Sequence, residues 1–183
     1  MIRMEEISTE SVHYSWLEAC WKNAFPESER GNETMQHFNV DCEDRFHCTL
    51  FFDKQKPIGF INWWVIEDFR YIEHFAIASQ FRNCGYGSQV LSHFIRCSSH
   101  PIILEVELPN SDQAIKRINF YERIGFKGHP KFKYIQPPYP GSEIEVPLML
   151  MTYGGIFSKA RLKDLVIAMY TMVYRTEVDY FSK

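Results

Sequence analysis

The sequence predicts a mixed α/β domain built on one sheet, and three observations support this prediction. Residues 46–52, 58–66 and 70–78 are strand-like and joined by short turns, which is typical of an antiparallel meander. Apolar residues at three- and four-residue spacing predict helices before and after it. Two later strand segments, beginning at Ile102 and Glu143, are separated by a further helical pattern. This order predicts a sheet covered by helices.

Two helices are expected before the meander. In residues 11–25 the apolar side chains recur at helical spacing from Val12 onward, and Pro26 ends the pattern. A second, weaker helix is expected near residues 33–39, with Met35 and Phe38 facing inward. The domain therefore begins with helices rather than strands in this interpretation.

The later elements alternate between helix and strand. A helix with an apolar face is expected after the meander, and a glycine at position 125 is a natural stop for the next one. The strands between them are short and apolar, as in a sheet covered on both faces. The expected order is a helix that starts at Ser88 and carries apolar residues up to Ile95, strand 102–106, helix 111–124, a strand from Phe126, strand 143–153 and a last helix from Leu162 to Val173.

Composition and charge exclude several classes of protein. The 183 residues are 45% hydrophobic, which suits a folded domain. A formal net charge of -3 argues against nucleic-acid binding and against attraction to an anionic membrane. The apolar runs are too short to span a bilayer. The five cysteines lack metal-ligand spacing, so neither a metal site nor secretion is expected, and a cytoplasmic protein is the default.

A glycine-containing turn follows the third strand of the meander. Residues 71–77 predict a buried strand, residues 82–87 (Arg-Asn-Cys-Gly-Tyr-Gly) a turn, and residues 88–91 the start of a helix. The first N–H groups of a helix have no partner within it, and the macrodipole adds partial positive charge there. Glycine lets a phosphate approach the backbone. The turn is therefore interpreted as a pyrophosphate site of a nucleotide-like cofactor, and the Rossmann alternative lacks its third glycine.

Two motifs give the chain a family resemblance. Arg82–Gly87 is similar to the Gln/Arg-x-x-Gly-x-Gly/Ala signature that wraps the CoA pyrophosphate in the GNAT superfamily. Asn119–Phe126 contains the Tyr-x-x-x-Gly-Phe pattern of that superfamily's second signature. Residues 24–30 also resemble the segment that borders the acceptor site in many members. Over roughly residues 1–153, the chain resembles the acetyl-CoA-dependent N-acetyltransferases of the GNAT superfamily.

The resemblance implies a fold and an activity. The fold would be the GNAT-like acyl-CoA N-acyltransferase fold, a mostly antiparallel central sheet with a splayed strand pair, flanked by helices. The domain would span residues 1–155, and residues 156–183 would form an amphipathic helical extension. This extension would pack on its own domain, with a homodimer contact as the alternative. The implied reaction moves an acetyl group from acetyl-CoA to a primary amine by direct attack in a ternary complex.

The resemblance also implies which residues bind acetyl-CoA. Main-chain N–H groups of the turn would hold the diphosphate, with Arg82 adding a charged fork and Ser88 a hydroxyl. The main chain at the end of the preceding strand would lie beside the pantetheine, and the Ile77 N–H would polarise the thioester carbonyl. The implied cofactor-binding residues are Phe75, Ala76, Ile77, Arg82, Asn83, Cys84, Gly85, Tyr86, Gly87 and Ser88.

Two residues are expected to move protons. Tyr121 is the candidate general acid, because a phenol can protonate the departing thiolate. Glu73 is the first candidate for the general base, since a carboxylate inside an apolar strand is costly unless it is paired or functional. His74 is its competitor, but it points to the opposite face of the strand. Glu105 and Glu107 in the next strand are further alternatives.

The sequence leaves alternatives open for the acetyl acceptor and for catalytic activity. The acceptor is a small-molecule or peptide amine, in a pocket formed by the first two helices and by residues 27–32 and 131–140. Ala114 stands where many members carry an asparagine that contacts the pantetheine arm. That departure motivates the alternative of a catalytically silent CoA-binding or regulatory module. A longer acyl-CoA as donor is a third hypothesis.

Overall fold

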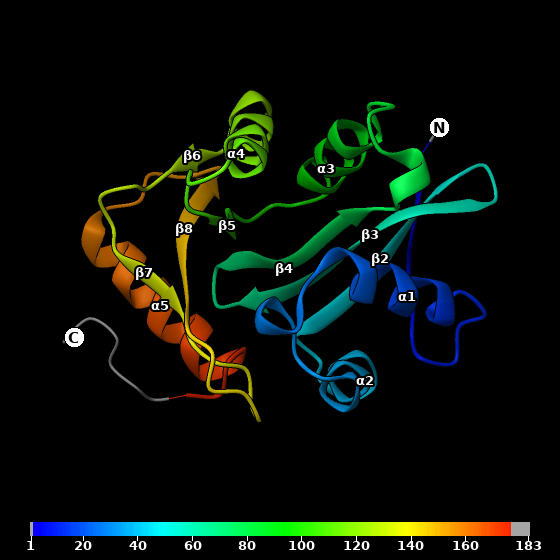
Figure 1. The fold of residues 1–183 in the computed structure, drawn as a ribbon, viewed down its shortest axis with the longest axis horizontal. Coiled ribbons are helices and arrows are strands. Elements are labelled where there is room, and N and C mark those ends of the chain that lie inside the picture. The colour runs from blue at the N-terminus through cyan, green and yellow to red at the C-terminus, as the bar shows by residue number, and fades with distance from the viewer. Residues whose placement is uncertain (1, 177–183) are drawn as a thin grey trace. The chain divides into compact units, whose positions relative to one another are not determined.

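The computed structural model of this protein describes residues 2–176. Its contacts divide the chain into two compact units. The first comprises the residues up to 65 together with 72–100, and the second comprises 66–71 together with the described residues after 100. Each unit contains both strands and helices (Figure 1). The mixed α/β class predicted from the sequence is confirmed, whereas the domain boundary after residue 155 stays a prediction.

The strands of the first unit form the expected meander. They are β2 (Phe46–Asp53), β3 (Lys56–Ile66) and β4 (Phe69–Ile77), and β4 has its first residues in the second unit. An unexpected strand, β1 (Ile2–Glu6), pairs antiparallel with β2. Its side chains are largely exposed. Its short sequence therefore lacks the clear apolar alternation by which a half-buried strand is found. Helices are therefore not the first elements of the chain.

Two helices cover one face of these strands. The first, α1 (Tyr14–Ala24), is followed by a 3₁₀ turn at Glu27–Glu29 and by α2 (Glu33–Cys42). The Asn32 side chain accepts a hydrogen bond from the Met35 N–H at 2.8 Å and so caps α2. Helix α1 buries Leu17 and Trp21 completely. These helices confirm the predicted order, although each is slightly shifted from its predicted range.

Two apolar residues assigned to these helices do not face inward. Val12 lies before α1 and is 91% exposed, and Phe38 on α2 is 48% exposed. The buried face of α2 is instead formed by Met35, Gln36 and Asn39. The expected inward placement of Met35 is confirmed, whereas the two polar members of this face have no apolar spacing to mark them. The expected inward placement of Phe38 was wrong for this reason.

The helix after the glycine turn covers the other face. Helix α3 (Tyr86–Arg96) buries Val90, Leu91 and Phe94, as its apolar spacing predicts. The Phe94 ring contacts Trp63 of β3 with 5.4 Å between ring centroids. Figure 1 shows α3 on one side of the first unit's strands and α1 on the other. The strands of this unit are therefore covered on both faces.

The second unit contains four further strands and two helices. Strand β8 (Val146–Tyr153) is the central one, and it pairs antiparallel with the other three. Helix α4 (Asp112–Ile124) starts at Ser111, whose hydroxyl caps the Ala114 N–H, and it ends at Gly125 in the left-handed conformation with φ of 111°. The partners of β8 are β5 (Ile102–Glu107), β6 (Lys127–Gly128) and β7 (Tyr134–Gln136).

The last helix packs within the second unit. Helix α5 (Lys159–Met172) buries Leu162, Leu165, Val166 and Met169, as the sequence predicts. The Tyr170 hydroxyl at its end donates to the Ile135 carbonyl of β7 at 2.6 Å. The predicted extension continues to residue 183, so its final seven residues lie outside the described part. Among residues 2–176, no helix has the length and apolar character needed to cross a membrane.

Candidate functional site

The predicted anion site is a tight turn at the start of α3. Asn83 and Gly85 both have positive φ, 61° and 79°, and Gly85 occupies the N-cap position. A side chain at Gly85 would be strained in this left-handed conformation. Among the described residues, the N-cap position of α3 provides no side-chain hydrogen bond to the first turn. N–H groups at such a helix end can bind an anion, and the anion site itself stays a prediction.

Side chains of the same segment fix the turn in place. The Arg82 Nε–H donates to the Ile77 carbonyl at 2.9 Å, which ties the turn to the end of β4. The Tyr86 hydroxyl donates to the Asp53 carboxylate at 2.7 Å, and this bond raises the pKa of Tyr86. Cys84 is an exposed free thiol. Hydrogen bonds to Ile77 and Asp53 therefore hold the turn in place, and the role of Asp53 was not predicted from the sequence.

The predicted residues of β4 alternate between two environments. Glu73, Phe75 and Ile77 are half-buried, whereas His74 and Ala76 are buried. The Glu73 carboxylate accepts a hydrogen bond from the Trp64 indole N–H at 2.6 Å. Trp64 was not predicted as part of the site. The carboxylate of Glu73, which is costly in an apolar strand, is therefore held by a hydrogen bond from the neighbouring strand β3.

Close backbone approach marks the end of β4. A Cβ atom added to Gly59 of β3 would lie 2.6 Å from the Ala76 carbonyl oxygen and 2.7 Å from a side-chain carbon of Ile77. Only glycine fits at that separation. Sequence reasoning placed Gly59 in a strand without giving it a role, although a glycine within a strand signals such an approach. Gly59 therefore sets the position of Ala76 and Ile77.

His74 lies on the side of β4 that faces α1. Its Nε2–H donates to the Glu29 carbonyl at 3.1 Å, and its ring contacts Phe25 and Trp21 with centroid separations of 4.6 and 5.8 Å. Burial lowers the pKa of His74, and the carboxylate of Glu73 opposes this change only partly. His74 is therefore neutral near pH 7 and connects β4 to the segment after α1.

The candidate acid lies in the second unit. Tyr121 of α4 is 8% exposed, and burial raises the pKa of its phenol to about 12. Its ring contacts Phe120 and Phe126 edge-on, at centroid separations of 5.1 and 5.6 Å. Tyr121 therefore keeps its proton near neutral pH, as a general acid must.

The alternative bases of β5 have different partners. Glu105 accepts hydrogen bonds from the Tyr134 hydroxyl and, at 3.0 Å, from the Tyr174 hydroxyl. Glu107 forms an ion pair with Arg117 at 2.5 Å. The structure therefore gathers residues 73–88 in the first unit, and it places Tyr121 and both alternative glutamates in the second.

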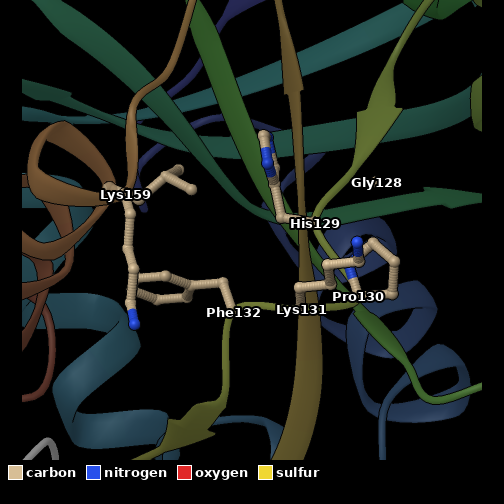
Figure 2. A pocket seen from close by; sticks show the side chains of 7 residues that line it. Gly128, His129, Pro130, Lys131, Phe132 and Lys159 are labelled. Carbon is tan, nitrogen blue, oxygen red and sulfur yellow. The ribbon is translucent and has the colours of Figure 1, made fainter.

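A pocket of about 340 Å³ lies within the second unit. It is mostly apolar, and two lysine side chains stand among its walls (Figure 2). Lys131 and Phe132 belong to the loop predicted to border the acceptor, whereas the α5 residues were not predicted. The pocket is lined by Gly128, His129, Pro130, Lys131, Phe132, Lys159 and Leu162.

One continuous stretch of the chain matches a protein-family model. Residues 12–126, more than half of the sequence, match the model described as the acetyltransferase (GNAT) family. The stretch includes β4, the glycine turn and the helix that carries Tyr121. The chain belongs to the GNAT acetyltransferase family, as the two sequence motifs had indicated.

Solved structures agree with this assignment. A GNAT-family acetyltransferase from Bacteroides thetaiotaomicron is 36% identical with a TM-score of 0.91, over 96% of this chain and 99% of that one. The ribosomal-protein-S18-alanine N-acetyltransferase of Escherichia coli is 18% identical (TM-score 0.58, 86% and 100% covered). A GNAT acetyltransferase from Elizabethkingia anophelis with acetyl-CoA bound is 17% identical, with a TM-score of 0.57 over 84% of this chain and 98% of that one. The latter two share the fold. No curated protein sequence matches this chain significantly.

Proposed function

We propose that this protein transfers an acetyl group from acetyl-CoA to a primary amine by direct attack in a ternary complex. The observation that carries the proposal is the uncapped start of α3, where Gly85 is left-handed and no side chain competes for the N–H groups. A diphosphate fits such a helix end. The acetyl-CoA bound to the Elizabethkingia anophelis relative of the same fold supports the choice of donor.

The donor would lie along the first unit. Main-chain N–H groups of residues 83–88 would hold the diphosphate, and Arg82 is positioned by Ile77 to contribute charge beside it. The end of β4 would run beside the pantetheine, with the small side chain of Ala76 at this point of the strand. The Ile77 N–H would then polarise the thioester carbonyl. Acetyl-CoA supplies the activated acyl group, and these residues bind and orient it.

Glu73 and Tyr121 would carry out the proton transfers. Glu73 would accept the proton of the attacking amine, and its bond to Trp64 fixes the orientation of the carboxylate for this role. Tyr121 would protonate the departing thiolate, because its phenol carries a proton near neutral pH. Neutral His74 and hydrogen-bonded Glu105 remain the alternative bases. The acceptor proposed is a small-molecule or peptide amine.

Binding of the donor is tested with the glycine turn. Wild-type protein should bind acetyl-CoA in isothermal titration, and the double variant Gly85→Glu, Gly87→Glu should lose that binding because a carboxylate would occupy the anion site. Gly141→Glu is the matched control, since Gly141 also has a positive φ of 90° but has open space around it. Absence of binding to folded wild-type protein would overturn the proposal.

The acid is tested separately by thiol release across an amine panel. Tyr121→Phe should lower kcat about 100-fold, the lower end of what a positioned acid contributes, while acetyl-CoA binding stays unchanged. Tyr153→Phe serves as control, because Tyr153 also packs against Phe126, at 5.4 Å between centroids. Unchanged turnover in Tyr121→Phe would remove this residue from its role without changing the class of reaction.

A second candidate function is a CoA-binding module without turnover. Ala114 favours it, because this buried alanine offers no amide to the pantetheine arm. Binding of acetyl-CoA without thiol release for any amine would support the module. Thiol release with one amine would exclude it.

A further inference from the structure

Several buried polar side chains of the first unit have an atom without a hydrogen-bond partner among residues 2–176. No side chain in this set is more than 6% exposed. About nine in ten buried polar groups in native proteins are paired with protein or ordered water, so such a set requires an explanation. The atoms are Tyr14 Oη, Trp21 Nε1, Gln36 Nε2, Asn62 Oδ1 and Nδ2, and His74 Nδ1.

Three of these residues lie on the helices that cover one face of the strands. Tyr14 and Trp21 are seven residues apart on α1, so they share one face of the helix. Gln36 belongs to the buried face of α2. Burial raises the pKa of Tyr14, and the nearby thiol of Cys48 on β2 raises it further. The Tyr14 hydroxyl therefore points toward the strands rather than toward solvent.

The other two residues face these helices from the strands. Asn62 of β3 lies opposite Cys48 of β2. The Ala78 N–H bonds to the Ile58 carbonyl, and counting four residues along each antiparallel strand brings Asn62 next to His74. The His74 ring in turn contacts Trp21. The unpaired atoms thus share one layer, between α1 and α2 on one side and β2, β3 and β4 on the other.

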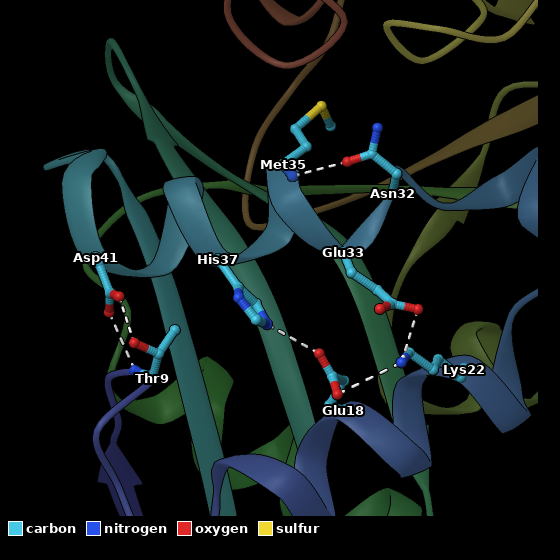
Figure 3. Close-up of polar contacts among 8 residues, drawn as sticks. All are labelled: Thr9, Glu18, Lys22, Asn32, Glu33, Met35, His37 and Asp41. Atoms are coloured by element: carbon cyan, nitrogen blue, oxygen red, sulfur yellow. Dashed lines mark hydrogen bonds and ion pairs between the residues drawn. The ribbon is translucent and has the colours of Figure 1, made fainter.

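The outer edge of this layer is closed by polar contacts of a different kind. Glu18 of α1 bonds to His37 of α2 at 2.9 Å, and Lys22 of α1 pairs with Glu33 of α2 at 2.7 Å (Figure 3). These side chains are paired with one another and hold the two helices together. The side chains with partnerless atoms are buried, so bulk water does not reach them.

The unpaired atoms are chemically complementary but do not bond to each other. The Trp21 indole only donates, and His74 Nδ1 only accepts, because the Nε2–H is already given to Glu29. The Asn62 amide offers one acceptor and two donors. A ligand must therefore both donate and accept, as water does. We propose that the layer enclosed by Tyr14, Trp21, Gln36, Asn62 and His74 is a binding site for ordered water molecules.

Water is favoured as the ligand of this layer over an acetyl-acceptor substrate or a metal cation. The side chains are closed off from the surface, and the described residues contain no group of three histidine, cysteine or acidic side chains that could hold a metal. Buried waters commonly make about three hydrogen bonds to such groups. The site connects α1 to β4, and His74 also holds Glu29. Water there therefore positions the segment that follows α1.

A high-resolution crystal structure of the full chain without added ligand tests the site directly. We expect electron density for water within about 3.2 Å of His74 Nδ1 and of the Asn62 amide. A layer without such density, or with these side chains paired directly to one another, would overturn the proposal. Because this readout involves neither acetyl-CoA nor turnover, its failure is separate from failure of the proposed acetyl transfer.

Thermal unfolding supplies an independent arm. Tyr14→Phe removes only the hydroxyl; if water is bound there, the Tm should fall by about 2 °C, as expected for one lost hydrogen bond in a chain of this size. Asn62→Leu should lower the Tm further, because bound water would lose its contacts with both Oδ1 and Nδ2 of Asn62. Val12→Ala is the control, as Val12 is exposed. An unchanged or raised Tm in both variants would show that the layer is dry.

Discussion

Two sets of buried polar groups, one in each unit, differ in how they are paired. In the second unit, the Glu105 carboxylate receives bonds from Tyr134 and Tyr174, and the Tyr71 hydroxyl lies 3.0 Å from that of Tyr174. In the first unit, five buried side chains keep atoms without a partner among the described residues. Burial alone therefore does not show how a polar group is satisfied. Protein groups complete the hydrogen bonds of one set, and we propose that water completes those of the other.

The largest expected effect concerns the carboxylate of the second unit. Glu105→Leu should lower the free energy of unfolding by about 3 kcal/mol, because two buried phenols lose a charged acceptor. Urea unfolding monitored by tryptophan fluorescence measures it. Glu107→Leu, two residues along β5, is the control, since its ion pair with Arg117 is partly exposed and should cost below about 1 kcal/mol. Equal losses would contradict the comparison.

The same substitution in each unit gives the next contrast. Tyr174→Phe should cost about 2 kcal/mol, because it removes a hydrogen bond to the Glu105 carboxylate. Tyr14→Phe, at a site of similar burial, should cost roughly half as much, since its hydroxyl has a water partner at most. Chemical denaturation of both variants measures the ratio. A larger loss for Tyr14→Phe would reverse the assignment of the two regions.

A pH titration sharpens the comparison at histidine. The pKa of His74 is lowered by burial, so the unfolded chain binds its proton more readily and the stabilising contribution is lost as the pH falls below about 6.5. The wild type should therefore lose up to about 1.4 kcal/mol per pH unit from this group. His74→Phe should flatten the profile between pH 7 and 5.

His129 provides the control for that titration. Its pKa is also lowered by desolvation, but it lies in the second unit and bonds to the Thr152 hydroxyl at 2.8 Å. It is only half-buried, so His129→Phe should flatten the profile less than His74→Phe. Identical profiles for the wild type and His74→Phe would show that His74 does not carry this dependence.

The smallest effect is expected at the seam between α1 and α2. Glu18→Gln keeps a hydrogen bond to His37 and removes the charge that pairs with Lys22 (Figure 3). The free energy of unfolding should change by less than about 0.5 kcal/mol, because the ion pairs are largely solvent-accessible and screened. The pKa of Glu18 is lowered by these partners, so the remaining difference should disappear in acid. A loss above that of Tyr14→Phe would show that the seam, rather than the layer, holds the helices.

Much of the local structure around the candidate site could be predicted because its signals are local, whereas the roles of the site residues stay predictions. Gly85 is left-handed where the pattern required it, and α3 begins directly after it. The spacing from this turn to Tyr121 anticipated one intervening strand, which is β5. What local patterns missed was Gly59 against Ala76 and the Trp64 bond to Glu73. Both join separate strands, and no spacing along a single strand encodes them.

Most elements and both family motifs could be found from the sequence, because helix periodicity, strand alternation and glycine conformation act over a few neighbouring residues. The partners of His74 and Glu105 depend on the folded chain. Their contacts come from Glu29 and Tyr174, which are 45 and 69 residues away along the chain. Hydrogen bonding and burial depend on distance in space, so the state of each buried polar group was set by the fold.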